Sequence, residues 1–187
     1  MSMSMQIVSA KSELFQKVRA LRSRYIGDNP ASEENFSDAE VLRDTYSYHM
    51  AYLDGGEIVG AIRITPLGHG VSFVERVVNV GHYFAHPMDS FDANRLVLDE
   101  KYRGGLYLRH FLLQAAIWLR ANTQFRYISA LCRGRLAALY VDIGGCVLAD
   151  DITWTSRQSP RDYSLVYLEL ETVFNTIKGK VIHGQFL

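Results

Sequence analysis

The sequence predicts a single α/β domain in which helices flank one mixed sheet. Through the middle of the chain, strand-length apolar runs alternate with helix-periodic segments, an order that favours parallel pairing there. Strand pairs joined by polar connections near both ends favour antiparallel pairing. No repeat, linker or low-complexity segment interrupts the 187 residues. We therefore expect one domain over 1–187, with a core over about 7–170 and a tail over 171–187 that the sequence does not place.

With 48% hydrophobic and 21% charged residues, the chain is large and apolar enough to bury a full core. No run approaches the roughly 18 apolar residues of a membrane span, and the N-terminal segment lacks the regions of a signal peptide. We expect a bacterial-type cytoplasmic location. Cys132 and Cys146 lack metal-ligand spacing and are expected in the core, and no metal is predicted.

The chain begins with a predicted helix. Ser12 can cap a helix from Glu13 to about Ile26, because the apolar residues that follow share one face at helical spacing. Residues 31–44 are polar and acidic. They indicate a loop with a short helical piece.

A β-hairpin is predicted next. Strand-forming runs at Thr45–Leu53 and Glu57–Thr65 flank the turn residues Asp54-Gly55-Gly56. Pro66 ends the second run. Residues 67–90 are glycine-containing and mixed, and we expect one or two short helices that cross over the sheet.

The second half alternates strands and helices. A strand at Arg95–Leu98 leads through a basic turn into a helix with an apolar stripe at i, i+3, i+4, i+7 and i+11, starting at Leu108. The remaining predicted elements are a strand at Phe125–Leu131, a helix at Arg133–Asp142, and strands at Cys146–Trp154 and Tyr163–Leu170.

The turn before the long helix is suited to a phosphate. Arg103-Gly104-Gly105 joins a strand to a helix N-terminus, where backbone N–H groups lack intrahelical partners. The helix dipole adds positive potential at the same place. This stretch is the strongest candidate for a ligand contact.

The element order and two motifs resemble the GNAT acyltransferase superfamily over about residues 7–170. The first motif is the turn at Arg103, where the superfamily has Arg/Gln-x-x-Gly-x-Gly/Ala and receives the pyrophosphate of acyl-CoA. The second is Leu136–Gly145 (LAALYVDIGG), which is similar to the superfamily's alanine-rich helix with a tyrosine shortly before a glycine. The resemblance implies an α+β fold with a mixed, mainly antiparallel twisted sheet.

The turn departs from the superfamily pattern in a way that concerns the acyl donor. Counted from Arg103, the two later glycine positions are Leu106 and Leu108, whose side chains hinder close approach of a diphosphate. Gly104-Gly105 offset this in part. The turn therefore suits one phosphate, such as that of a phosphopantetheine arm on an acyl carrier protein. Donor contacts are expected at Leu96, Val97, Arg103, Gly104, Gly105 and Leu106.

Charge is unevenly distributed, although the net charge is zero. Residues 95–135 contain eight Lys/Arg against two acids, which suits an acidic or phosphorylated partner or forms a solvated face balanced elsewhere. Both alternatives stay open. The resemblance implies an acidic acyl carrier protein, bound by a basic surface at Lys17, Arg19, Arg22, Arg24, Arg103 and Arg109.

Two further segments resemble acyl-homoserine-lactone synthases, which are GNAT-like and take acyl chains from carrier protein. Asp92–Leu96 (DANRL) is similar to their Glu-x-Ser-Arg-Phe segment, and Gly60–Pro66 (GAIRITP) to their Gly-x-x-Arg-Leu-x-Pro strand. Their N-terminal tryptophan is missing here, which argues against a methionine-derived acceptor and a lactone product. The run NRLVLDEKYRGGLYLR best resembles the related long-chain N-acyl amino acid synthases, including N-acyl-tyrosine synthases.

Acyl transfer to an amine needs a deprotonated amine, a donor to the developing oxyanion and a proton for the leaving thiolate. The resemblance implies that a backbone N–H of Leu96, Val97 or Leu98 polarises the carbonyl. It also implies that Tyr140 is the general acid; the alternative is a tyrosine that packs under the sheet. Asp92, or a water it holds, is expected to receive the amine proton, unless it is only a strand-entry residue.

Arg63 and Arg95 lie in otherwise apolar strands, where a guanidinium needs an anionic partner. The carboxylate of an amino-acid acceptor is one such partner; a salt bridge to Glu57, Glu75 or Asp92 is the alternative. His49 is expected beside the acceptor or as a structural histidine. An apolar channel for the acyl tail, or ordinary core, is expected from Phe73, Val77, Val78, Tyr83, Phe84, Leu106, Phe111 and Trp118.

The leading hypothesis is an N-acyltransferase that moves a long acyl chain from acyl carrier protein to the α-amine of an amino acid, with tyrosine as one candidate. The thioester, on carrier protein or on CoA, is a substrate, and no tightly bound cofactor is expected. One alternative is an acetyl-CoA-dependent GNAT N-acetyltransferase. Another is a non-catalytic GNAT-like module that binds an acyl chain or a partner.

Overall fold

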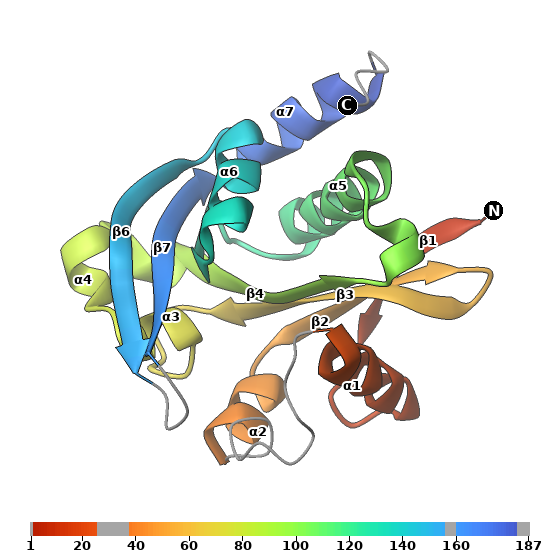
Figure 1. Cartoon of the computed structure of the whole chain (residues 1–187), viewed down its shortest axis with the longest axis horizontal. Coiled ribbons are helices and arrows are strands. Elements are labelled where there is room, and N and C mark those ends of the chain that lie inside the picture. The colour runs from red at the N-terminus through yellow and green to blue at the C-terminus, as the bar shows by residue number, and fades with distance from the viewer. Residues whose placement is uncertain (1, 26–37, 156–159, 183–187) are drawn as a thin grey trace.

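The computed structural model describes residues 2–25, 38–155 and 160–182, and these form a seven-stranded sheet in the order β1-β2-β3-β4-β5-β7-β6 (Figure 1). Only β4 and β5 pair in parallel, and every other neighbouring pair is antiparallel. The predicted mixed, mainly antiparallel sheet is therefore confirmed. Its strands are β1 (Met3–Val8), β2 (Tyr48–Asp54), β3 (Glu57–Pro66), β4 (Ser90–Leu98), β5 (Tyr127–Cys132), β6 (Cys146–Thr155) and β7 (Pro160–Glu169).

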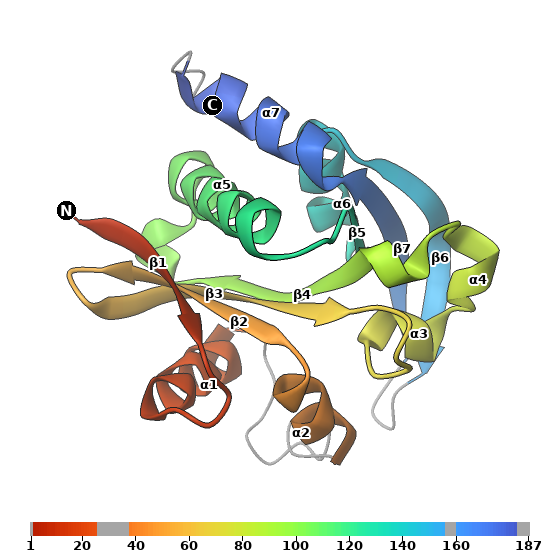
Figure 2. The same cartoon turned by 180° about the vertical axis from the view of Figure 1, so that it is seen from behind.

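Helices cover both faces of the sheet (Figures 1 and 2). One face carries the two N-terminal helices, and the other carries the three longest helices of the C-terminal half. The described helices are α1 (Glu13–Tyr25), α2 (Asp38–Thr45), α3 (Phe73–Val77), α4 (Val80–Tyr83), α5 (Gly105–Asn122), α6 (Gly134–Asp142) and α7 (Leu170–Ile182), with 3-10 turns η1 (Pro87–Asp89) and η2 (Glu100–Tyr102). None of the described helices is long and apolar enough to cross a membrane.

Three apolar clusters hold these layers together. The largest lies between the sheet and α5, α6 and α7, and includes Phe111 and Ile177. A second cluster packs α1 against the sheet through the buried residues Phe15 and Val18. The third joins α3 and the segment after α4 to β7 around Val74. Burial of apolar surface on both faces is what makes a sheet of this size stable.

Most predicted elements are confirmed, with corrections at the ends of the chain. The hairpin has its turn at Gly55 and Gly56, whose φ angles of 56° and 91° suit glycine. The first strand, β1, was not predicted, because its alternating Met and Ser residues lack β-branched side chains. Part of the predicted first loop lies outside the described residues, and its predicted short helical piece is α2, which extends to Thr45.

The strand β4 begins earlier than predicted and carries a bulge. It starts at Ser90 rather than Arg95. Opposite β3, Ala61 pairs with Val97 but Arg63 pairs with Asn94, so two residues of β4 face Ile62 alone. One of them, Arg95, has a left-handed φ of 55°. Such a backbone costs about 1–3 kcal/mol for a non-glycine residue and is often retained at functional sites.

Gly145 connects α6 to β6 at a close contact, and its replacement by alanine should destabilise the fold. A Cβ there would lie 2.6 Å from Leu168 Cγ and 2.8 Å from the backbone oxygen of Tyr140. We expect Gly145→Ala to lower the free energy of unfolding by about 1–3 kcal/mol, measured by urea denaturation. Gly134→Ala in α6 is the control, because nothing lies within 4 Å of its Cβ position. Equal stability of both variants would contradict this packing.

Candidate functional site

The site is built around the place where β4 and β5 separate. The two strands pair only from Ser90 to Asp92 of β4 with Tyr127 to Ser129 of β5. Beyond that point β4 continues to Leu98 and β5 to Cys132 without pairing to each other. Backbone groups of both strands on the facing sides are therefore left without a strand partner in the described structure, and they are available to a ligand chain that enters between them.

The turn after β4 presents a helix N-terminus at the open end of this separation. Gly104 is the N-cap of α5 and has no side-chain cap, so the first N–H groups of α5 stay unsatisfied by the cap residue. Arg103 turns back: its Nε donates to Leu98 O at 3.2 Å and its guanidinium lies 4.6 Å from the Tyr25 ring centre. Leu106 is 46% exposed beside these groups.

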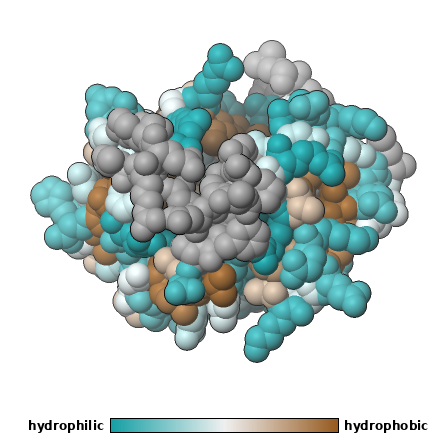
Figure 3. Space-filling view, turned by 60° about the horizontal axis from the view of Figure 1, so that its bottom comes forward, coloured by the Kyte–Doolittle hydropathy of each residue, from teal (hydrophilic) through white to brown (hydrophobic). Residues whose placement is uncertain are grey.

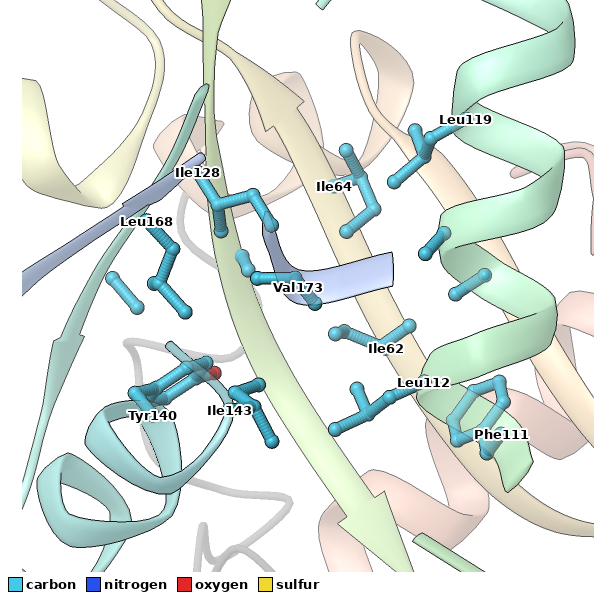
Figure 4. Packing of buried hydrophobic residues seen from close by; sticks show 14 of the residues in the cluster. Ile62, Ile64, Phe111, Leu112, Leu119, Ile128, Tyr140, Ile143, Leu168 and Val173 are labelled. Atoms are coloured by element: carbon cyan, nitrogen blue, oxygen red, sulfur yellow. The ribbon is translucent and has the colours of Figure 1, made fainter. Parts of the chain in front are cut away.

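Tyr140 of α6 points into the space over β4 (Figure 4). Its side chain is buried, and burial raises the pKa of its hydroxyl well above the ordinary value, with smaller contributions from Cys132 and Asp92. A tyrosine in this state stays protonated at neutral pH. It can donate a hydrogen bond, although the raised pKa makes it a weaker acid than an ordinary tyrosine, and it cannot act as a base there.

An apolar cavity of about 40 Å³ lies next to Tyr140, between the sheet and α5, α6 and α7 (Figure 4). Ile62 and Ala93 form its floor on the sheet, and Leu112 belongs to its α5 wall. The channel predicted from aromatic residues is not formed: Phe73 packs against Trp154 and Phe84 against Tyr167, while Phe111 stacks on Tyr52. Phe111 belongs to the cluster under α5, whereas Phe84 belongs to the separate cluster around Val74.

Asp92 lies where the two strands part, and it caps a helix. Its Oδ2 accepts hydrogen bonds from the backbone N–H groups of Phe73 (3.0 Å) and Val74 (3.3 Å) at the start of α3. No hydrogen bond reaches Oδ1 within the described residues, although the side chain is completely buried. Burial raises the pKa of this carboxyl to about 6, against the opposing effects of the Val74 N–H and Arg63.

On the face of the sheet opposite the apolar cavity, Arg63 belongs to a buried ion network. Its Nη1 donates to Glu40 Oε1 and to Asp44 Oδ1, both at 2.7 Å, and its Nε donates to Asn94 Oδ1 at 2.6 Å. The alternative salt-bridge partners predicted from sequence were therefore wrong, because Glu57, Glu75 and Asp92 make none of these bonds. With 1% of its surface exposed, Arg63 is held inside the protein.

Three more arginines join the same two carboxylates. Arg43 pairs with Glu40, and Arg95 Nη2 lies 3.2 Å from Glu40 Oε1. Arg22 Nη1 lies 3.4 Å from Asp44 Oδ1. The guanidinium groups hold the pKa of Glu40 at about 2, in spite of its burial. The side chain of Arg95 is 21% exposed and is the most accessible of these cations.

His49 lies beneath this network and does not reach the surface. Its ring accepts at Nδ1 from Arg22 Nη2 (3.0 Å) and donates from Nε2 to Asp44 O (2.8 Å), the tautomer that satisfies both atoms. Burial, followed by Arg22, lowers the pKa of His49 to about 4. His49 is therefore neutral near pH 7 and positions Arg22 and Asp44, which agrees with the alternative of a structural histidine.

The predicted basic surface divides into exposed and buried residues. Lys17 and Arg24 line a groove of about 390 Å³ between α1 and η2, on a face that is mostly hydrophilic in its described part (Figure 3). Arg22 is buried in the ion network, so its expected surface role was wrong. Arg109 Nη2 lies 3.2 Å from Asp142 Oδ2 and links α5 to α6.

Sequence reasoning missed Glu40, Arg43 and Asp44. Their i, i+3 and i, i+4 spacing was a usable signal, because it places Glu40 beside both other residues on one helix face. No cluster of three or more His, Cys, Asp or Glu suited to a metal occurs in the described residues.

Asp92→Asn should change the pH dependence of stability. The folded pKa of Asp92 is raised, so wild type loses stability as pH rises from about 4 to about 6 while the buried group ionises. Asparagine keeps an acceptor for the α3 N–H groups and never ionises. We expect Asp92→Asn to gain about 3 kcal/mol of unfolding free energy over wild type across this range, by urea denaturation.

The exposed Asp150 in β6 provides the matched control, because Asp150→Asn removes a solvated carboxylate. A parallel pH profile for wild type and Asp92→Asn would contradict the raised pKa.

Comparisons with known proteins identify the fold through solved structures rather than through sequence. The sequence matches no protein-family model and no curated protein. The structure is similar to that of BjaI, a CoA-dependent acyl-homoserine lactone synthase, with a TM-score of 0.69 and 12% identity over 96% of this chain and 90% of that chain. It is also similar to MesI, another CoA-dependent acyl-homoserine lactone synthase (TM-score 0.64, 15% identity, 97% and 95% covered).

An acetyltransferase of the GNAT family from Streptococcus pneumoniae has a similar structure as well, with a TM-score of 0.59 and 13% identity over 90% of this chain and 99% of that chain. The mainly antiparallel sheet, with its parallel pair at β4–β5, agrees with the predicted fold. At these low identities the likeness concerns the backbone alone. The described chain thus has the fold of the GNAT acyltransferases.

Proposed function

We propose that this protein is an N-acyltransferase that moves a long-chain acyl group from acyl carrier protein to the α-amine of an amino acid, with tyrosine as one candidate acceptor. The proposal rests on three features that lie together where β4 and β5 separate. A protonated, buried Tyr140 borders an apolar cavity there, and a helix N-terminus lies at the end of the same strand.

The proposed reaction assigns one step to each of these groups. The pantetheine arm extends between β4 and β5, and a backbone N–H of Leu96, Val97 or Leu98 beside the bulge stabilises the oxyanion. The amine attacks the thioester carbonyl, the C–S bond breaks, and Tyr140 gives its proton to the leaving thiolate. Asp92, with a pKa of about 6, accepts the amine proton directly or through a water.

The donor end of the site favours a single phosphate. The backbone at Gly104 is open, with nothing within 4 Å of a Cβ position, but Leu106 projects beside it. Arg103 is already bonded to Leu98 O, so it contributes positive potential more than a diphosphate clamp. CoA is the alternative donor, favoured by the CoA-dependent synthases among the similar structures.

The carrier protein is proposed to dock beside this end. Lys17 and Arg24 of α1 lie near Lys101 of η2 around the larger groove, and Arg103 follows directly. Arg19 is half-buried on the same helix. An acidic protein that contacts these residues would bring its phosphopantetheine to the N-terminus of α5.

The most direct test identifies product and donor together. Mass spectrometry of lipid extracts from bacteria that express the protein should reveal an N-acyl amino acid. The purified protein should then use long-chain acyl carrier protein well and acetyl-CoA poorly. Robust turnover of acetyl-CoA, with indifference to carrier protein, would contradict the proposed donor. Consumption of no thioester would favour a binding module instead.

Arg95 is the proposed anchor for the acceptor carboxylate, because it is the accessible cation of the buried network. We expect Arg95→Ala to raise the KM for the amino acid about ten- to a hundredfold, since a charge-assisted hydrogen bond contributes about 1.5–3 kcal/mol. The KM for the acyl donor should stay unchanged. Steady-state kinetics with each substrate varied in turn measure both constants.

Arg126→Ala is the control, because this arginine is exposed at the far end of β5. If Arg95→Ala lowers stability but leaves both KM values unchanged, the role of Arg95 is to form the ion pair with Glu40, and the acceptor binds elsewhere.

A further inference from the structure

The C-terminal helix α7 closes the apolar cavity from outside. Leu170 and Val173 of its first turn are buried and line the cavity. Figure 4 shows Val173 near the centre of the cluster, with Leu168 and Ile128 on one side and Ile62 on the other. The part of the chain that the sequence could not place therefore forms one wall of the candidate acyl pocket.

The cavity is too small for a long acyl chain as it stands. A cavity of about 150 Å³ holds a six-carbon benzene ring, or about 25 Å³ for each carbon. The 40 Å³ beside Tyr140 thus has room for one or two carbons. A longer chain must displace a wall.

Unlike the sheet floor of the cavity, α7 is held by side-chain packing of Val173 and Ile177 and by ion pairs, without a hydrogen-bond ladder to a neighbouring strand. Floor residues Ile62 and Ala93 belong to central strands of the sheet, whose hydrogen-bond ladders resist displacement. Helix α7 is tethered to α5 by Arg120–Glu171 (2.8 Å) and to α6 by Lys180–Asp142 (2.5 Å), which are partly exposed ion pairs. Such pairs contribute about 0–1 kcal/mol each.

The attachment of α7 also permits a swing. The backbone N–H of Leu170 donates to Arg126 O at 2.8 Å, which fixes the start of the helix directly after β7. A rotation about this point would shift Val173, one turn along the helix, away from the sheet while the β7 strand stays in place.

We infer that α7 is the displaceable wall of the acyl pocket and that Leu170 and Val173 set the length of the acyl chain. This inference rests on the proposed acyltransferase function. Substitutions at Val173 should change which chain lengths are used, because the side chain occupies the volume that the chain end needs.

Two opposite substitutions test it. Val173→Ala removes two carbons and should lengthen the preferred acyl chain by about two carbons, whereas Val173→Ile adds one and should shorten it by about one. Val181→Ala is the matched control, because Val181 lies on the same helix but does not line the cavity. The measurement is kcat/KM over a series of straight-chain acyl thioesters. Opposite shifts from the two variants cannot arise from loss of stability alone.

A second readout separates this inference from the proposed function. The melting temperature of each protein is measured with a series of free straight-chain fatty acids, which need no turnover. Suppose that no variant transfers an acyl group, but that the fatty-acid length giving the largest rise in melting temperature still changes with residue 173. The inference about α7 is then supported and the proposed acyltransferase function is contradicted. If acyl transfer occurs and wild type, Val173→Ala, Val173→Ile and Val181→Ala share one length profile, the inference is overturned and the proposed function stands.

Discussion

The candidate site depends on one constraint in the sheet: β4 and β5 stay paired for only three residue pairs. Further along β4, Arg95 adopts a left-handed backbone and the register with β3 slips. That strain is maintained because β3, α1 and the ion network hold the strand from the other side. Because the strands separate, Tyr140 and the apolar cavity lie beside backbone groups that have no strand partner in the described structure. Helix α5 begins at the open end of the separation.

The buried ion network fixes the face of the same strands that lies opposite the cavity. Four guanidinium groups converge on Glu40 and Asp44, and His49 supports them from below. Desolvation of so many charges is unfavourable, and the pKa of Arg22 falls to about 9 as a result. The network ties α2 to β3 and leaves Arg95 toward solvent.

Local patterns predicted the elements well and their long-range pairing poorly. The hairpin at Gly55-Gly56 and the helix after Gly104 follow from turn chemistry and apolar periodicity. The end of β4–β5 pairing at Asp92 does not, because residues 93–98 have the composition of an ordinary strand. Arg63 was recognised as needing an anion, but its partners come from a helix about twenty residues earlier that was expected to be mostly loop. The apolar spacing of Leu170, Val173 and Ile177 could have revealed α7.

The most direct test of the account is the structure of the protein bound to a long-chain thioether analogue of acyl-phosphopantetheine. The account predicts that the phosphate lies at the N-terminus of α5 and the sulfur within hydrogen-bond reach of the Tyr140 hydroxyl. The alkyl chain should run into the cavity beneath a displaced α7. An analogue bound in the groove between α1 and η2, with Tyr140 and α7 unchanged, would contradict it.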